Sequence, residues 1–155
     1  MELWPVKRVI VLKKRLKTVN LSMLQVGKVV LDTSVVVRHF RQQTSLDTVL
    51  VEASEIFLPS IVLGELFYGA FNAGKQWREE TLNQVRTFSS MMTIAYPDED
   101  TAEVYARSRL ELKEKGKPIP DNDIWIAAIA LQRGLPLYAN DDHFEQLEAL
   151  NYVKT

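Results

Sequence analysis

Four carboxylates stand where apolar segments of the chain give way to turns or to helix starts. Carboxylate oxygens are the ligands that hard divalent cations such as Mg²⁺ and Mn²⁺ prefer. If four acids meet, their repulsion raises some of their pKa values, and a bound cation relieves it. Substrate phosphate often completes the shell of such an ion, so the natural chemistry is hydrolysis of a phosphodiester. The four acids are Asp32, Glu65, Asp123 and Asp141.

The composition excludes the other common metal centres. The chain has no cysteine and only two histidines, His39 and His143, so a thiolate zinc site and a histidine-rich site are both excluded. The lack of disulfides suits a reducing cytoplasm, and we expect a cytoplasmic protein. With 155 residues, of which 46% are hydrophobic and 25% charged, the chain should fold as one globular domain.

From residue 28 onward, short β-branched runs alternate with helical periodicity, which is typical of βα units around a parallel sheet. In such a sheet, ligands bind beyond the carboxyl ends of the strands. Asp32 directly follows the first predicted strand and Asp141 lies two residues beyond the fourth, so both belong to one edge. The predicted strands are 28–31, 56–58, 93–96, 136–139 and 152–153, and the predicted helices are 33–41, 60–73, 75–91, 100–115, 123–133 and 142–150.

The two other acids lie in helices that begin near this edge. Glu65 has apolar neighbours in sequence, and a carboxylate buried there is costly unless a cation or hydrogen bonds compensate it. Asp123 lies in the first turn of its helix, just after Asp121 and Asn122, one of which is expected to cap it. Acids are favoured at helix N-termini for dipole and capping reasons alone, so each acid also has a structural explanation. The metal site depends on their convergence.

Several further side chains have both a functional and an ordinary interpretation. His143 begins a predicted helix, which favours a capping or surface role over general-base catalysis. Trp125 lies in an apolar helix and is expected in the core or in a dimer interface. Basic residues near the groove can contact phosphate, although charges on exposed helix faces are commonly just solvated. The candidate phosphate contacts are Arg38, Arg41, Lys75 and Arg78.

The front of the chain is strongly basic. Residues 1–28 carry seven Lys or Arg side chains and one Glu, while the whole chain has a net charge of −1. The segment is too short and too charged for a transmembrane helix, and it lacks a signal-peptide cleavage site. Three interpretations stay open: a nucleic-acid or membrane-surface arm, a peripheral helix or strand, and a translated region upstream of a true start at Met23. We therefore separate a basic extension, 1–27, from a domain, 28–155.

Four segments of the chain, taken together, resemble the PIN-domain nuclease family and, more narrowly, the VapC-type toxins of prokaryotic toxin–antitoxin pairs. Each segment alone is weak, but four in order at family-like spacing are fairly specific, and they span roughly residues 28–153. The segments are Val30-Leu31-Asp32-Thr33-Ser34; Gly64-Glu65-Leu66 with Gly69; Gly116 through Ile119 to Asp123 with Ile126-Ala127-Ala128; and Asn140-Asp141 with His143-Phe144.

The resemblance implies a three-layer α/β/α domain with a central, mainly parallel sheet. It implies an endoribonuclease in which the four acids ligate Mg²⁺ or Mn²⁺ and activate water, with Asp141 completing the principal site or holding a second ion. Thr33 would assist, Asp121 would hold a metal-bound water, and Asn140 would support the site. It also implies an RNA substrate, a homodimer, and a cognate VapB-like antitoxin that fills the active groove.

One departure from the family pattern favours keeping an alternative. The family often has Ser or Thr two residues before the fourth acid, whereas this chain has Ala139. Because Asn140 and Asp141 remain, we expect tuned rather than abolished activity. The alternative is a PIN-like domain that binds RNA or a protein without cutting it. A dinucleotide-binding fold is excluded because no glycine-rich turn follows a strand.

Overall fold

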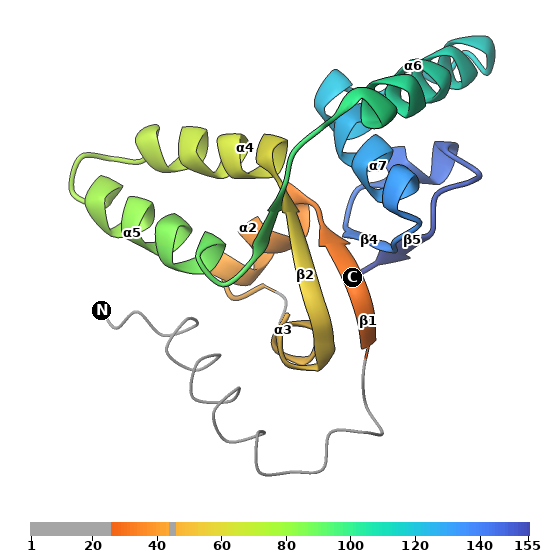
Figure 1. The fold of residues 1–155 in the computed structure, drawn as a ribbon. Helices are drawn as coiled ribbons and strands as arrows, with labels where there is room; N and C mark the ends of the chain where they lie inside the picture. Colours follow the sequence, from red (N-terminus) through yellow and green to blue (C-terminus); the bar gives the residue numbers. More distant parts are fainter. Residues whose placement is uncertain (1–25, 44–45) are drawn as a thin grey trace.

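The computed structural model describes residues 26–43 and 46–155 (Figure 1). The interpretations of the basic extension therefore fall almost entirely outside the described residues. The described chain forms one five-stranded sheet in the order β3-β2-β1-β4-β5, and every neighbouring pair is parallel. The strands are β1 (Val26–Leu31), β2 (Ala53–Pro59), β3 (Thr93–Ala95), β4 (Leu137–Ala139) and β5 (Tyr152–Lys154).

Helices flank this sheet on both sides, which confirms the predicted three-layer α/β/α fold. The chain moves outward from β1 to β3 and then crosses to the other side of β1 to form β4, so the two halves of the chain supply different helical layers (Figure 1). The helices are α2 (Thr33–Phe40), α3 (Asp47–Glu52), α4 (Ser60–Phe71), α5 (Arg78–Ser89), α6 (Glu99–Glu114), α7 (Asp121–Arg133) and the short 3-10 helix η2 (Asp142–Gln146).

Two apolar segments, one in β1 and one in α7, form the centre of the hydrophobic core. Val29, Val30 and Leu31 of β1 are fully buried, as expected for a central strand of a parallel sheet. Residues 126–130 of α7 are also fully buried, so α7 packs tightly into the centre of the domain. No helix in the described part of the chain is long and apolar enough to cross a membrane.

The strand order reverses between β1 and β4, and this defines the functional edge of the sheet. Leu31 pairs with Tyr138, and the N–H of Asp32 donates to the carbonyl of Tyr138 at 3.0 Å. The carboxyl ends of β1 and β4 therefore lie side by side. Open parallel sheets bind ligands at such a switch point, and Asp32 and Asp141 both follow it.

Several helices differ from the sequence prediction. The helix predicted at 100–115 begins one residue earlier, because α6 starts at Glu99 and is capped by Asp98, whose carboxylate accepts the N–H of Thr101 at 2.9 Å. Thr101 is fully buried, and its burial favours a helix start at which Asp98 and Thr101 cap each other. The helix predicted at 142–150 is only a 3-10 turn ending at Gln146, and the short helix α3 was not predicted.

The cap predicted for α7 is also wrong. The helix begins at Asp121 and its N-cap residue is Pro120, which makes no side-chain cap. Asn122 instead uses its amide elsewhere, as described below. The predicted end is correct, since Gly134 stops the helix with φ 61°, a left-handed conformation that suits glycine.

Candidate active site

Asp32 is the most buried of the four acids. It follows β1 and caps α2: its carboxylate accepts the N–H of Ser34 at 2.8 Å and also the Ser34 hydroxyl. Its exposed fraction is only 4%. Burial raises the pKa of Asp32, the Ser34 hydrogen bonds act against this rise, and the nearby charge of Glu65 adds to it.

Glu65 connects three elements at the same edge. It lies in the second turn of α4, which begins directly after β2. One of its oxygens accepts the amide of Asn122 from α7 at 2.6 Å, and the other accepts the hydroxyl of Thr33 from α2. Thr33, predicted to assist, therefore touches the acidic group through Glu65. Asn122 was expected only as a cap, and sequence reasoning missed this contact.

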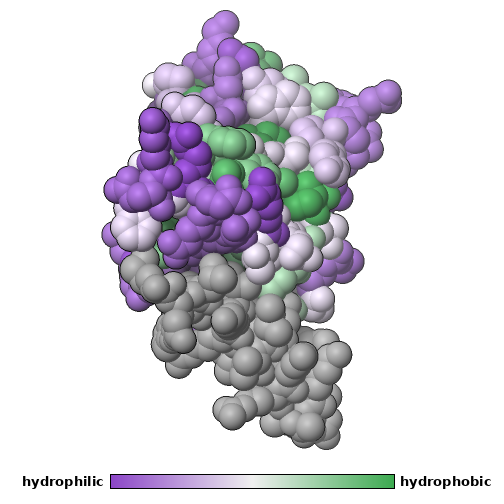
Figure 2. Space-filling model, turned by 90° about the vertical axis from the view of Figure 1, so that its left-hand side faces the viewer, coloured by the Kyte–Doolittle hydropathy of each residue, from purple (hydrophilic) through white to green (hydrophobic). Residues whose placement is uncertain are grey.

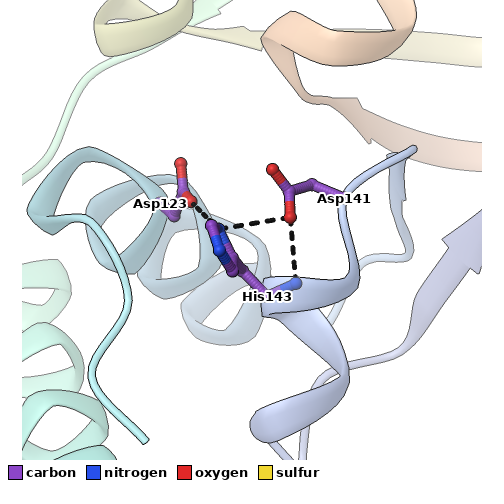
Figure 3. A group of neighbouring side chains, drawn as sticks. All are labelled: Asp123, Asp141 and His143. Atoms are coloured by element: carbon purple, nitrogen blue, oxygen red, sulfur yellow. Dashed lines mark hydrogen bonds and ion pairs between the residues drawn. The ribbon is translucent and has the colours of Figure 1, made fainter.

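Asp123 and Asp141 are bridged by a histidine (Figure 3). His143 Nδ1 lies 3.1 Å from Asp123 Oδ2 and 3.2 Å from Asp141 Oδ1. The backbone N–H of His143 donates to Asp141 Oδ1 at 3.0 Å, so the predicted capping contact is present. The ring is nevertheless turned back toward the acids, a contact that the sequence analysis did not predict. The sequence feature that could have indicated this contact is the position of His143, two residues after Asp141 at the start of a short helix.

The four acids form one continuous row. The pKa of Asp123 is raised, first by burial and then by the negative charges of Asp32 and Asp141, while the hydrogen bond from His143 lowers it. Since Asp32 in turn feels the charge of Glu65, the row runs from Glu65 through Asp32 and Asp123 to Asp141. The four acids are therefore near enough to influence one another in turn, although only Asp123 and Asp141 share a group of potential ligand atoms within 4.8 Å, and the role of all four as metal ligands stays a prediction.

The residues predicted to support this row lie at different distances from it. Asp121 is turned toward α6, where its carboxylate accepts the hydroxyl of Tyr105 at 3.1 Å and lies 3.3 Å from Arg109. Tyr105 also stacks on Trp125, with ring centroids 4.0 Å apart. The structure thus brings Asp121 together with α6 rather than with the four acids.

Asn140 and Arg38 form a second support beside Asp141. The Asn140 backbone N–H donates to the Ser34 hydroxyl at 2.9 Å, which links the turn after β4 to Asp32. Its side-chain oxygen accepts Arg38 Nη1 at 2.7 Å when the amide is oriented to satisfy both of its neighbours. Arg38 Nε is buried and has no hydrogen-bond partner. Ala139 is fully buried in β4, so its side chain belongs to the core.

A groove opens beside Glu65 between α2, α4 and α5. Its volume is about 270 Å³, and apolar side chains such as Leu66 and Val85 line most of it, with Arg41 and Gln84 adding polar groups. Figure 2 looks onto the side formed by α4 and α5 and shows apolar surface enclosed by hydrophilic side chains. Lys75 and Arg78 are exposed near the α4–α5 turn, farther along this side.

Burial of Asp32 and Asp123 should make the stability of the metal-free protein depend on pH. Because their pKa values are raised above 3.8, the folded chain holds protons that the unfolded chain has already released. Their contribution to stability is present below the unfolded pKa and is lost as the pH rises through the folded values. Urea unfolding in a chelator should therefore show this contribution declining from acidic to neutral pH.

Two variants make this measurement specific. Asp32→Asn should flatten the decline. Asp98→Asn should instead make the decline steeper. Hydrogen bonds from Thr101 lower the pKa of Asp98, so its contribution to stability is lost as the pH falls and offsets part of the decline in the wild type. A decline that is identical in wild type and Asp32→Asn would contradict the prediction.

Comparison with known proteins assigns the family. The family model described as "PIN domain" matches residues 29–150. Ribonuclease VapC5 of Mycobacterium tuberculosis is 34% identical over 126 residues, which cover 81% of this chain and 91% of the relative. Ribonuclease VapC2 of Haemophilus influenzae is 32% identical over 126 residues, covering 79% and 94%.

Solved structures agree with this assignment. VapBC-5 from Mycobacterium tuberculosis gives a TM-score of 0.68 at 31% identity and covers 83% of this chain and 98% of that one. The DNA-bound VapBC from Salmonella typhimurium gives a TM-score of 0.75 at 28% identity, covering 82% and 97%. The chain therefore belongs to the PIN-domain family and, within it, to the VapC type.

Proposed function

We propose that this protein is a toxin endoribonuclease that hydrolyses RNA phosphodiester bonds with Mg²⁺ or Mn²⁺ and is inhibited by a VapB-like antitoxin. The observation that carries the proposal is the row of four carboxylates at the switch point of the sheet, two of them with raised pKa values. The names of the relatives support ribonuclease activity, and the similar VapBC structures support the antitoxin.

The donor set fits a divalent cation. Among residues 26–43 and 46–155, no Lys or Arg side chain forms an ion pair with any of the four acids. Within these residues, the contacts that compensate the acids are hydrogen bonds, including the one between His143 and Asp123. Such a set of carboxylates suits Mg²⁺ and Mn²⁺. We assign Asp32, Glu65, Asp123 and Asp141 as the residues that hold the ion.

The chain's own side chains then have distinct tasks. When bound, the cation supplies the positive charge that activates water and stabilises the phosphate as it reacts. Ser34 fixes the orientation of Asp32, while Thr33 and Asn122 fix the two oxygens of Glu65. Because the donors lie on α2 and α7 and Glu65 itself lies on α4, these contacts orient the carboxylates before substrate binds.

Phosphate recognition is proposed for basic side chains along the same edge and groove. Arg38 is held beside Asp141 through the contact of its Nη1 with Asn140, so it is the first candidate. Arg41 lines the groove next to Glu65. Lys75 and Arg78 lie farther away and would contact RNA only beyond the cleaved bond.

The antitoxin is proposed to occupy the groove between α2, α4 and α5. Its lining is mainly apolar, as expected for a protein segment, and Glu65 and Arg41 at its side provide polar contacts. An occupant would therefore block access to Glu65 and exclude RNA. The homodimer that the resemblance implies is also proposed, and sedimentation equilibrium of the isolated protein would test it.

Cleavage of a labelled RNA pool by the purified protein tests the proposed function. Mn²⁺ or Mg²⁺ should support cleavage, and a chelator should stop it. Asp142→Asn is a matched control, because Asp142 is adjacent to the row but pairs with Lys154. RNA binding without cleavage at any metal concentration would instead favour the alternative, a non-catalytic RNA-binding domain.

Thr33→Val should lower cleavage activity and metal affinity by about 10 to 100-fold, because it removes the hydroxyl that orients Glu65. Thr33→Ser keeps the hydroxyl and should retain most of both. Titration calorimetry with Mn²⁺ and initial cleavage rates would measure the two effects. Equal behaviour of the valine and serine variants would show that the hydroxyl has no such role.

A further inference from the structure

We propose that His143 is a nitrogen ligand of the bound ion and that it makes the site favour Mn²⁺ over Mg²⁺. This inference rests on the proposed metal-dependent function and assigns one more residue to that site. It starts from Figure 3, in which the imidazole of His143 lies between the carboxylates of Asp123 and Asp141.

The geometry places three donor atoms around one point. One atom each from Asp123, Asp141 and His143 lie within 4.8 Å of one another, and this is the only such group of three or more potential ligands within the described part of the chain. Asp32 and Glu65 adjoin the group but are not in it. The tightest part of the row is therefore an O, O, N set rather than an all-oxygen set.

The position of the imidazole is fixed by its own backbone. The N–H of His143 donates to Asp141 Oδ1 at 3.0 Å, and the next residue, Phe144, is almost completely buried. These two anchors hold the start of η2 against the acids. Because the side chain is still 47% exposed, its nitrogen can turn toward an ion without disturbing the core.

The ring nitrogen changes which ion the site prefers. Mg²⁺ and Mn²⁺ both bind mainly oxygen ligands in proteins, but Mn²⁺, as a softer transition-metal ion, accepts an imidazole nitrogen more readily than Mg²⁺ does. An imidazole at 3.1 Å and 3.2 Å from the two carboxylates should therefore strengthen Mn²⁺ binding and contribute little to Mg²⁺ binding. His143 would thus determine metal specificity.

Metal titration of two variants tests this inference. His143→Gln should weaken Mn²⁺ binding by about 10-fold or more and change Mg²⁺ binding much less, since loss of a group that tunes a metal site changes affinity on this scale. Asp142→Asn, one residue away and paired with Lys154, should leave both affinities unchanged. Calorimetry at one pH gives all of these values without reference to activity.

A spectroscopic measurement gives a direct answer. Electron spin-echo spectra of Mn²⁺ bound to the wild-type protein should show coupling to a ¹⁴N nucleus, and His143→Gln should lose it. Mn²⁺ binding without this coupling in the wild type would overturn the inference and leave the proposed function intact. Failure of the wild type to bind Mn²⁺ at all would overturn both. Equal weakening of Mg²⁺ and Mn²⁺ in His143→Gln would also overturn it, indicating a purely structural role.

Discussion

Asp32→Asn should lower metal-dependent RNA cleavage by about 10²–10³-fold, the scale seen when one preorganised electrostatic group is removed from an active site. Asp32 lies inside the row of acids, beside Glu65 and Asp123, and only 4% of it is exposed. An amide keeps the shape of the side chain but removes the negative charge that holds the cation. Initial rates with a labelled RNA in Mn²⁺ would measure the loss.

The same variant should fold as well as the wild type. Asparagine keeps an oxygen that can accept the N–H of Ser34, so the cap of α2 is preserved. It also avoids the desolvation that raises the pKa of Asp32, so the metal-free variant should be at least as stable as the metal-free wild type. Mn²⁺ should raise the melting temperature of the wild type much more than that of the variant. Full cleavage activity in Asp32→Asn would refute the proposed function.

Phe88→Ala should reduce the free energy of unfolding by about 3–5 kcal/mol, the range measured for removing a buried phenylalanine. Phe88 of α5 is 1% exposed, and its ring meets Phe40 of α2 edge to face, with centroids 5.2 Å apart. The substitution leaves a cavity between the two helices that border the groove. Urea unfolding followed by circular dichroism would measure the change.

Leu110→Ala is the matched control for this prediction. Leu110 lies on α6 and is 55% exposed, so its truncation should change stability by only about 0.5 kcal/mol or less. If Phe88→Ala lowers the free energy of unfolding no more than Leu110→Ala does, the packing of α5 does not depend on the Phe88 ring. If Phe88→Ala does not fold, Phe88→Leu should give a smaller, measurable loss.

The parallel strands and the edge of the sheet that carries the acids could be predicted because they follow from local patterns. The β-branched runs around residues 28–31 and 136–139 predict parallel strands, and parallel strands present their carboxyl ends at one edge. That rule places Asp32 and Asp141 at the same edge, and the pairing of β1 with β4, which was not predicted, makes them neighbours. The apolar neighbours of Glu65 likewise indicate a carboxylate that needs compensation.

The contacts between separate helices could not be predicted in the same way. Asn122 and Glu65 are 57 residues apart, and their hydrogen bond depends on how α7 packs against α4. A local view gives Asn122 a cap role, because Asn is favoured at helix starts. His143 is a similar case: its cap contact was expected, but the direction of its ring depends on where α7 places Asp123. Tertiary packing decided both outcomes.

The position of β4 beside β1 has a consequence for protein synthesis. The hydrogen bond from Asn140 to Ser34 joins residues 106 positions apart, and β4 can pair with β1 only after most of the chain has left the ribosome. A nascent chain that ends before residue 141 lacks Asp141, one of the four acids. Such a chain cannot assemble the proposed centre, so an amino-terminal fragment should lack the proposed activity while synthesis is under way.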